Sequence, residues 1–240
     1  MNRLLVLGVL AALAACSPKQ EAAKEPAAEA PQAAVTAPAE EPVDAPAGAY
    51  TMDPAHTSLL FRVDHLGFSN YTARFKKSSA QLQFDPDNLA ASNVTVVVDA
   101  KSLETDFPDP ASLDFNAELL SEKWLNAAKY PEITFRSISV EPTGARTMRI
   151  NGELTLRGVT RPMVLEARLN GGYRGHPMDP NARIGFSATG VLKRSEFGID
   201  YGIPAPGTKM GVSDAVNVIV ETEFSGPPLS SPTGEGGQTK

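Results

Sequence analysis

A two-residue alternation of apolar and polar side chains recurs through most of this chain after residue 50. It is clearest at residues 148–157, where Met148, Ile150 and Leu154 alternate with Arg149 and Glu153. The same period recurs at residues 57–66, 163–169, 184–188 and 216–224, and further strands are predicted at residues 81–84, 94–99 and 133–140. Successive side chains of a β-strand point to opposite faces. This period therefore predicts antiparallel sheets with one packed face and one solvated face.

Turn residues and one helical window divide these strands. Clusters of Asp, Asn, Pro and Gly predict turns at residues 85–88, 142–144, 170–172 and 179–181. Residues 111–128 have a helical period instead, which is set by Leu113, Leu119, Leu120, Trp124 and Ala127. About eight strands with one short helix, and no Cys–Trp–Cys pattern, favour a closed all-β barrel over an immunoglobulin-like sandwich. An eight-stranded barrel is just wide enough to be filled by side chains or to hold one slender ligand.

The first sixteen residues indicate export. A short basic start is followed by an apolar run at residues 4–15, which is too short for the roughly 20 residues that span a bilayer. Cys16, the only cysteine, comes directly after the small residues Ala14 and Ala15, an arrangement that resembles a bacterial lipobox. Lipidation of Cys16 would anchor the chain to a membrane without spanning it. The alternative is an ordinary signal cut that leaves Cys16 as an exposed thiol, a liability in an oxidising compartment.

Composition divides the rest of the chain into a tether, a domain and a tail. Residues 16–48 are rich in Ala, Pro and Glu, with no aromatic residue, so they are predicted to be a disordered spacer between the membrane and the domain. Residues 49–226 are predicted to be the barrel domain and residues 227–240 a disordered tail. Ser17 follows the cysteine in place of the aspartate that resembles an inner-membrane retention signal. We therefore expect a periplasm-facing lipoprotein of the outer membrane.

Several functional classes lack their sequence signals. The net charge is −6 and no basic or basic–aromatic run is present, which argues against nucleic-acid binding. The three histidines lie on separate segments without paired cysteines, so no metal site is predicted. There is no nucleophile elbow and no phosphate-binding loop. The sequence therefore predicts neither a catalytic residue nor a cofactor.

A barrel of this size would need only an apolar bore and one polar mouth to hold a hydrocarbon ligand. The strand period predicts which side chains face the bore, although plain core packing is the commoner role for each of them taken alone. The predicted interior residues are Leu59, Phe61, Val63, His65, Phe135, Ile150, Leu154, Leu156, Leu165, Phe186, Val218 and Val220.

Three polar residues are candidates for contacts with a ligand, each with a structural alternative. His65 lies on the apolar face of its strand, where it could contact a ligand or be a hydrogen-bonded core histidine. His56 could line the mouth or stabilise a turn with Asp53. Arg194 could bind an anionic head group at the mouth or form an ion pair with a neighbouring carboxylate.

Four stretches of this sequence form one recognisable set. They read DPAHTS running on to FRVDHLG within residues 53–67, KYPEITF at 129–135, GELTLRGVTRP at 152–162 and RSEFG at 194–198. Together they resemble the YceI-like family of polyisoprenoid-binding proteins. The resemblance implies an extended lipocalin-like antiparallel barrel that binds a long isoprenoid chain in the cell envelope. It also implies a helix over part of the mouth, which places Trp124 there.

Some positions depart from the family pattern. Arg74 precedes Phe75 where the family often has a glycine before the aromatic residue of its second strand, and Glu118 stands where a histidine is common near the start of the helix. Trp124 and Leu125 replace paired phenylalanines. Because the family's helix covers part of the mouth, these departures affect the expected head group more than the fold.

Three functions remain open from the sequence. The first is a non-catalytic carrier for a quinone or polyprenyl lipid, as a monomer or weak dimer. The second is an enzyme that acts on an amphiphile in the bore, with His65 as acid or base. The third is a side-chain-filled barrel that binds other envelope proteins, such as a membrane redox partner. The volume of the bore distinguishes the first function from the third.

Overall fold

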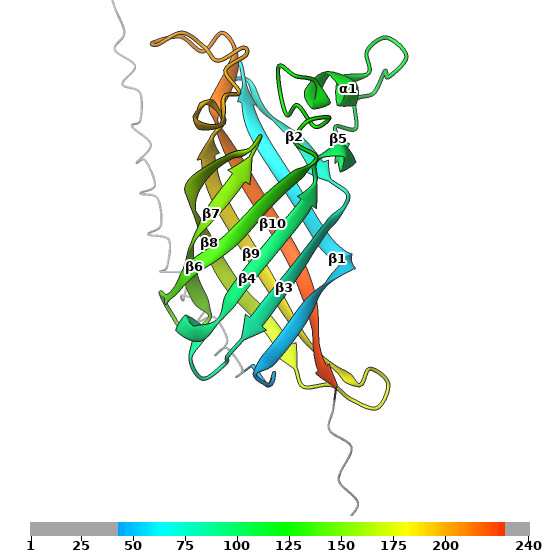
Figure 1. Cartoon of the computed structure of the whole chain (residues 1–240), viewed down its shortest axis with the longest axis vertical. Coiled ribbons are helices and arrows are strands. Elements are labelled where there is room, and N and C mark those ends of the chain that lie inside the picture. Colours follow the sequence, from blue (N-terminus) through cyan, green and yellow to red (C-terminus); the bar gives the residue numbers. More distant parts are fainter. Residues whose placement is uncertain (1–42, 229–240) are drawn as a thin grey trace, which may run out of the picture. The chain divides into compact units, whose positions relative to one another are not determined.

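The computed structural model describes residues 43–228, which form a closed antiparallel barrel (Figure 1). The predicted signal segment, Cys16, nearly all of the predicted tether and the end of the tail lie outside the described residues. The strands are β1 (Gly48–His65), β2 (Ser69–Phe75), β3 (Ser78–Phe84), β4 (Asn93–Asp99), β5 (Leu103–Glu104), β6 (Glu132–Pro142), β7 (Thr147–Leu156), β8 (Val159–Tyr173), β9 (Asn181–Lys193) and β10 (Val212–Pro228). The helices are α1 (Phe115–Leu120) and the short 3-10 turns Leu89–Ala91, Ala100–Ser102 and Arg194–Phe197.

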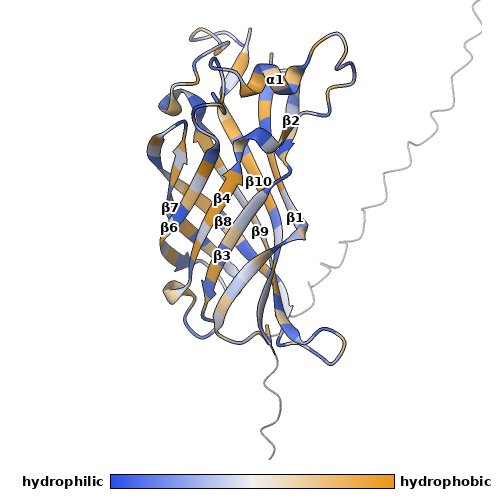
Figure 2. Cartoon of the chain, turned by 45° about the vertical axis from the view of Figure 1, so that its right-hand side comes forward, coloured by the Kyte–Doolittle hydropathy of each residue, from blue (hydrophilic) through white to orange (hydrophobic). Residues whose placement is uncertain are grey.

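The barrel closes because β1 pairs with β10 along most of its length, for example Leu59 with Val220. The other edge of β1 is shared by two strands, since β2 pairs with its second half and β3 with its first residues. In the same way, β4 pairs with β3 and the short β5 pairs with β2, so β4 and β5 together occupy one position of the barrel. Ten strands therefore fill the eight positions of an antiparallel barrel, which confirms the predicted fold class. Hydrophobic and hydrophilic residues mix along each strand, as the two-residue period requires (Figure 2).

The domain begins and ends slightly outside the predicted boundaries. Asp44 forms a bridge with Tyr173 and an ion pair with Arg174 at 2.6 Å, and Ala45 is buried. The last strand continues to Pro228. The described sheet pairings close the barrel, and both described hydrophobic core clusters lie inside it, so we expect residues 43–228 to fold on their own.

Two predicted elements differ from the structure. Of the helical window at 111–128 only Phe115–Leu120 is α-helix, capped by the Asp114 carboxylate, which accepts from the Ala117 N–H at 2.9 Å. The helix ends because Ser121 is extended, and Asn126 adopts a left-handed φ of 48° in the turns that follow. The predicted turn at 170–172 lies inside β8, where the strand has a bulge after Leu169. Glycine is needed there because a side chain at Gly172 would meet the Arg183 carbonyl oxygen at 2.6 Å.

The two ends of the barrel differ, and this difference positions the site. One end, here called the closed end, is filled by the rings of Tyr50, Phe84, Phe186 and Phe224, whose neighbouring centroids lie 5.8, 6.4 and 6.1 Å apart. Tyr50 is fully buried, its hydroxyl donates to the Pro46 carbonyl at 2.7 Å, and burial raises its pKa to about 12. The opposite end, here called the open end, carries the β1–β2 turn, α1 and the loop before β10 (Figure 1).

Candidate binding cavity

A cavity of about 690 Å³ occupies the barrel between the aromatic cluster of the closed end and the segment that contains α1. This volume is within the range of small-molecule sites, ~300–1,000 Å³. Its wall is almost entirely apolar and includes residues of β1, β3, β4, β6, β7, β8, β9 and β10. The barrel is therefore hollow, and its inward side chains line this cavity.

All twelve residues predicted for the interior line this cavity, and Trp124 and Arg194 line it as well. The predicted interior residues line one cavity because of the strand register, since cross-strand partners such as Phe61 and Val218 point to the same side of the sheet. Several other residues that line the cavity were not predicted from the sequence. Some are on the predicted strands, where the same period could have identified them, and others are at the open end. They include Leu82, Val96, Phe75, Leu103, Phe107 and Phe115.

His65 lies at the rim of the cavity. It is the last residue of β1, at the open end, and its side chain is exposed although it contributes to the lining. A buried, hydrogen-bonded core histidine is therefore not its role. His65 is placed where the polar part of a ligand would leave the apolar bore.

Of the predicted site residues that the structure describes, only His56 does not line the cavity. Its imidazole Nδ1 lies 3.0 Å from the Asp53 carboxylate and 4.0 Å from that of Glu223, and it is largely exposed. The hydrogen bond with Asp53 raises the pKa of His56. Asp53 also accepts from the Ala55 N–H at 2.9 Å and from Arg183 at 2.6 Å, and its own pKa is lowered, first by His56 and then by Arg183. His56 is thus bonded to Asp53 at the bulge of β1, outside the cavity, and not in a turn before the strand as the sequence suggested.

Arg194 is buried at the open end, with only 4% of its surface exposed. Its guanidinium donates to the backbone carbonyls of Ser213, Ile199, Tyr201 and Val212 at 2.9, 2.9, 2.8 and 2.7 Å. Burial lowers its pKa. Four of its five N–H donors are therefore committed to one loop, and few remain for a head group. Among the described residues no carboxylate forms an ion pair with Arg194, which was the alternative that the sequence left open. The Asp214 carboxylate accepts from the N–H and hydroxyl of Ser195, both at 2.8 Å.

Trp124 covers part of the open end, as the family resemblance implied. Its ring lies 5.4 Å from the Tyr201 ring and 5.4 Å from the Arg194 guanidinium. Its indole N–H donates to Glu118 at 3.1 Å, so two positions that depart from the family pattern contact each other. Leu119 and Leu125 of the same segment also line the cavity. This apolar segment therefore covers part of the open end. Arg194 connects it to the loop before β10, because its guanidinium lies over the Trp124 ring and donates to the carbonyls of Ile199 and Tyr201.

Two negative findings apply to residues 43–228. No group of three or more His, Cys, Asp or Glu side chains is arranged to bind a metal ion. No helix in this part of the chain has the length and apolar character that a membrane span requires.

Comparison with known proteins assigns the domain to a family. Residues 50–224 match the YceI-like domain. The chain belongs to the YceI-like domain family. Protein YceI of Escherichia coli O157:H7 is 36% identical over 169 residues, which cover 70% of this chain and 81% of that protein.

Solved structures of YceI-like and related barrels have the same fold. The Campylobacter jejuni YceI protein is 28% identical and superposes with a TM-score of 0.57 over 68% of this chain and 90% of that one. A polyisoprenoid binding domain from Saccharophagus degradans, implicated in plant cell wall breakdown, is 17% identical with a TM-score of 0.50 over 75% of this chain and 99% of that one. At that identity the second likeness shows the fold alone.

Proposed function

We propose that this YceI-like protein is a non-catalytic carrier for a long-chain isoprenoid lipid of the quinone or polyprenyl type. The observation that carries the proposal is the apolar cavity of about 690 Å³, which lies between the aromatic cluster of the closed end and the residues His65 and Trp124 of the open end. A self-filled barrel would leave no such volume, so the cavity supports a carrier over a protein-interaction module. The polyisoprenoid binding domain from Saccharophagus degradans has the same fold, which agrees with this proposal.

The cavity suits a hydrocarbon tail because its wall offers area and almost no directional bonds. Each buried CH₂ contributes roughly 0.8 kcal/mol, so a long tail is held by area alone. A CH₂ group is about the size of a water molecule, which takes up ~30 Å³ in the liquid. A cavity of about 690 Å³ therefore has room for on the order of twenty carbon atoms or more. A tail of several isoprene units fits, and the aromatic cluster at the closed end limits its depth.

The rim favours an uncharged head group. Of the side chains that line the cavity, only His65 and Arg194 are basic, and none is acidic. The arginine donates to four backbone carbonyls and so offers little to a phosphate. His65, at the open end, can donate to or accept from a head group such as a quinone carbonyl or a prenol hydroxyl. A quinone or alcohol therefore suits this site better than a diphosphate.

The proposed setting is the bacterial cell envelope, with a lipid on Cys16 as anchor and the outer membrane as its location. The described chain enters the domain at the closed end, where Ala45 and Tyr50 are buried. A tether from the anchored membrane would therefore reach the barrel at the pole opposite its mouth. This arrangement suits a carrier that meets a second membrane or a membrane redox partner with its open end.

Trp124 provides the test, because it is the only tryptophan and lines the cavity. Residues 43–228 are titrated with geranylgeraniol and, separately, with geranylgeranyl diphosphate while Trp124 emission is recorded. We expect a saturable change with the alcohol and at least roughly tenfold weaker binding of the diphosphate, because burying an unpaired charge is costly. No saturable change with either compound would refute the proposal. Tighter binding of the diphosphate would refute the preference for an uncharged head group.

A further inference from the structure

Two large apolar side chains project from neighbouring loops at the open end. Phe68, in the β1–β2 turn, is 83% exposed, and Met210, in the loop before β10, is 75% exposed. The two loops are joined, since the Leu66 N–H donates to the Gly211 carbonyl at 2.9 Å. A side chain at Gly67 would meet the Cδ of Lys209 at 2.9 Å. Phe68 and Met210 therefore project from two loops that are held together by a hydrogen bond.

The β1–β2 turn is built to hold Phe68 outward. Leu66 and Gly67 both have left-handed φ values, 58° and 73°, which make the turn tight. The Phe68 N–H donates to the His65 carbonyl at 3.0 Å, and the Gly67 N–H donates to the Asp64 carboxylate at 2.9 Å. The backbone thus has a defined conformation, and the exposure of Phe68 is part of that conformation.

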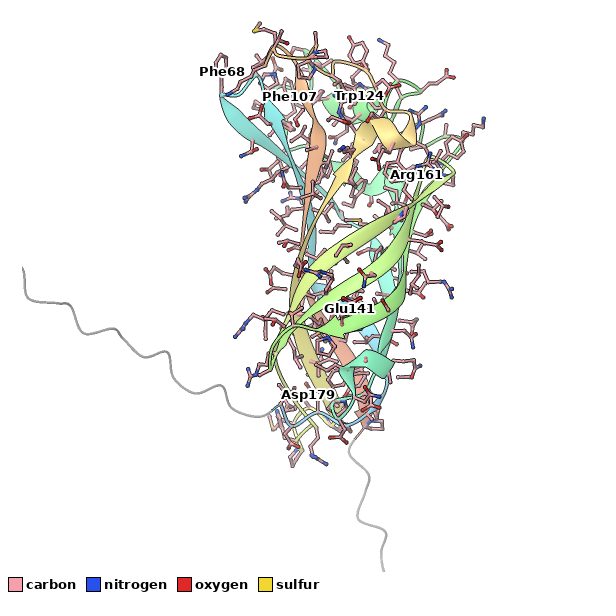
Figure 3. All side chains as sticks on the ribbon, turned by 90° about the vertical axis from the view of Figure 1, so that its left-hand side faces the viewer. Phe68, Phe107, Trp124, Glu141, Arg161 and Asp179 are labelled. Atoms are coloured by element: carbon pink, nitrogen blue, oxygen red, sulfur yellow. The ribbon has the colours of Figure 1, made fainter. Side chains whose placement is uncertain are left out.

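These two loops lie beside the mouth of the cavity. His65 and Val212, next to the two loops, line the cavity. Elsewhere at the open end, Tyr201 is 55% exposed against Trp124, and Leu113 is 45% exposed beside α1. Figure 3 shows Phe68, Phe107 and Trp124 together at this end, far from Asp179 at the other. The cavity therefore opens within an exposed set of apolar side chains, here called the apolar rim: Phe68, Leu113, Tyr201 and Met210.

The chemistry of the apolar rim fits a lipid surface. Tyr201 has an apolar ring with a polar tip, and the Lys123 ammonium lies 5.1 Å from that ring. Lys209 is adjacent to Met210, and lysine stems lie along apolar surface while their charge stays in water. Aromatic and apolar side chains flanked by lysine are typical of protein segments that rest in the interface of a bilayer.

We infer that the apolar rim inserts into one leaflet of a lipid bilayer, so that the ligand passes between bilayer and cavity without crossing water. This inference rests on the proposed carrier function, which gives the mouth a reason to meet its lipid reservoir. Exposed apolar area alone does not distinguish a bilayer from a protein partner. The continuity of the apolar rim with an apolar cavity favours the bilayer.

Vesicle binding tests the inference with a matched control. Residues 43–228 are mixed with phosphatidylcholine vesicles, and the bound fraction is measured by flotation. Quenching of Trp124 by brominated acyl chains is recorded in parallel. The double variant Phe68→Ser/Met210→Ser should partition at least roughly tenfold less than the unsubstituted protein. Met178→Ser is the control, because Met178 is 90% exposed but lies beside Asp179 at the closed end. It should bind vesicles like the unsubstituted protein and show the same quenching.

Three results would overturn the inference. The unsubstituted protein could fail to bind vesicles, the double variant could bind them equally well, or Met178→Ser could weaken binding as much as the double variant does.

Geranylgeraniol binding in solution, measured by Trp124 emission, distinguishes failure of the docking inference from failure of the carrier proposal. Neither Phe68 nor Met210 lines the cavity, so the double variant should keep this affinity. Solution binding without vesicle binding refutes only the docking inference. Loss of solution binding in the unsubstituted protein refutes the carrier.

Discussion

Replacing Arg194 with methionine is expected to lower the free energy of unfolding by about 3–5 kcal/mol. The guanidinium is almost fully buried and donates to four backbone carbonyls of the segment from Ile199 to Ser213. Methionine fills similar volume but donates nothing, so these carbonyls lose charge-assisted bonds in a site with little water. Both partners of a buried ion pair can be replaced together by apolar side chains. These carbonyls belong to the backbone, so no substitution removes them and the methionine variant leaves them unsatisfied. Urea unfolding measures the loss.

Arg194→Lys serves as the control for this prediction. Lysine keeps the charge but has three donors where four hydrogen bonds are made, so it should lose less stability than methionine does. Hydrogen exchange should show the effect first in the loop before β10, where the Val212 N–H donates to the Gly202 carbonyl at 2.8 Å. A loss below about 1 kcal/mol in the methionine variant would mean that the arginine does not organise the open end.

Replacing Ala188 with phenylalanine is expected to stabilise the lipid-free protein and to weaken lipid binding strongly. Ala188 lines the cavity, so a ring at this position enters empty space and gains apolar contacts, by about 1 kcal/mol or more. The same ring occupies part of the volume that the tail needs. We expect at least a roughly tenfold loss of geranylgeraniol affinity, read by Trp124.

Ala182→Phe is the matched control because Ala182 is on the same strand and on the same face of β9. Ala182 is fully buried in the core cluster of the closed end and does not line the cavity. Enlarging it should lower the free energy of unfolding by about 1–3 kcal/mol, as overpacking of a filled core does. Opposite signs for the two variants identify a hollow barrel. Similar destabilisation by both would mean that the bore fills itself with side chains.

The strand period predicted most of the wall of this barrel. The alternation in β1, β7 and β10 predicted which side chains point inward, because a shift of one residue would turn the whole apolar set of a strand towards solvent. That is why all twelve predicted interior residues line one cavity. β2 was not recognised from its period, although Tyr71, Ala73 and Phe75 alternate with polar residues there.

The open end could not be predicted in the same way, since it depends on irregular backbone. The apolar spacing that indicated a longer helix is satisfied by turns that direct Trp124 and Leu125 towards the bore. Arg194 was expected to contact an anion, yet its partners are backbone carbonyls. Every residue has such a carbonyl, so no sequence motif indicates which of them an arginine will bind. Whether the bore is hollow is equally hidden, because packed and ligand-lined positions require the same apolar residues.

Native mass spectrometry after export tests the central claim most directly. Residues 43–228 are secreted into a bacterial periplasm, purified without detergent, measured intact and then extracted with solvent. The carrier account predicts one discrete additional mass per protein that extracts as a quinone or an uncharged polyprenyl lipid, and its absence from Ala188→Phe. A purified protein that is free of lipid, and that remains so after incubation with candidate isoprenoids, would contradict the account.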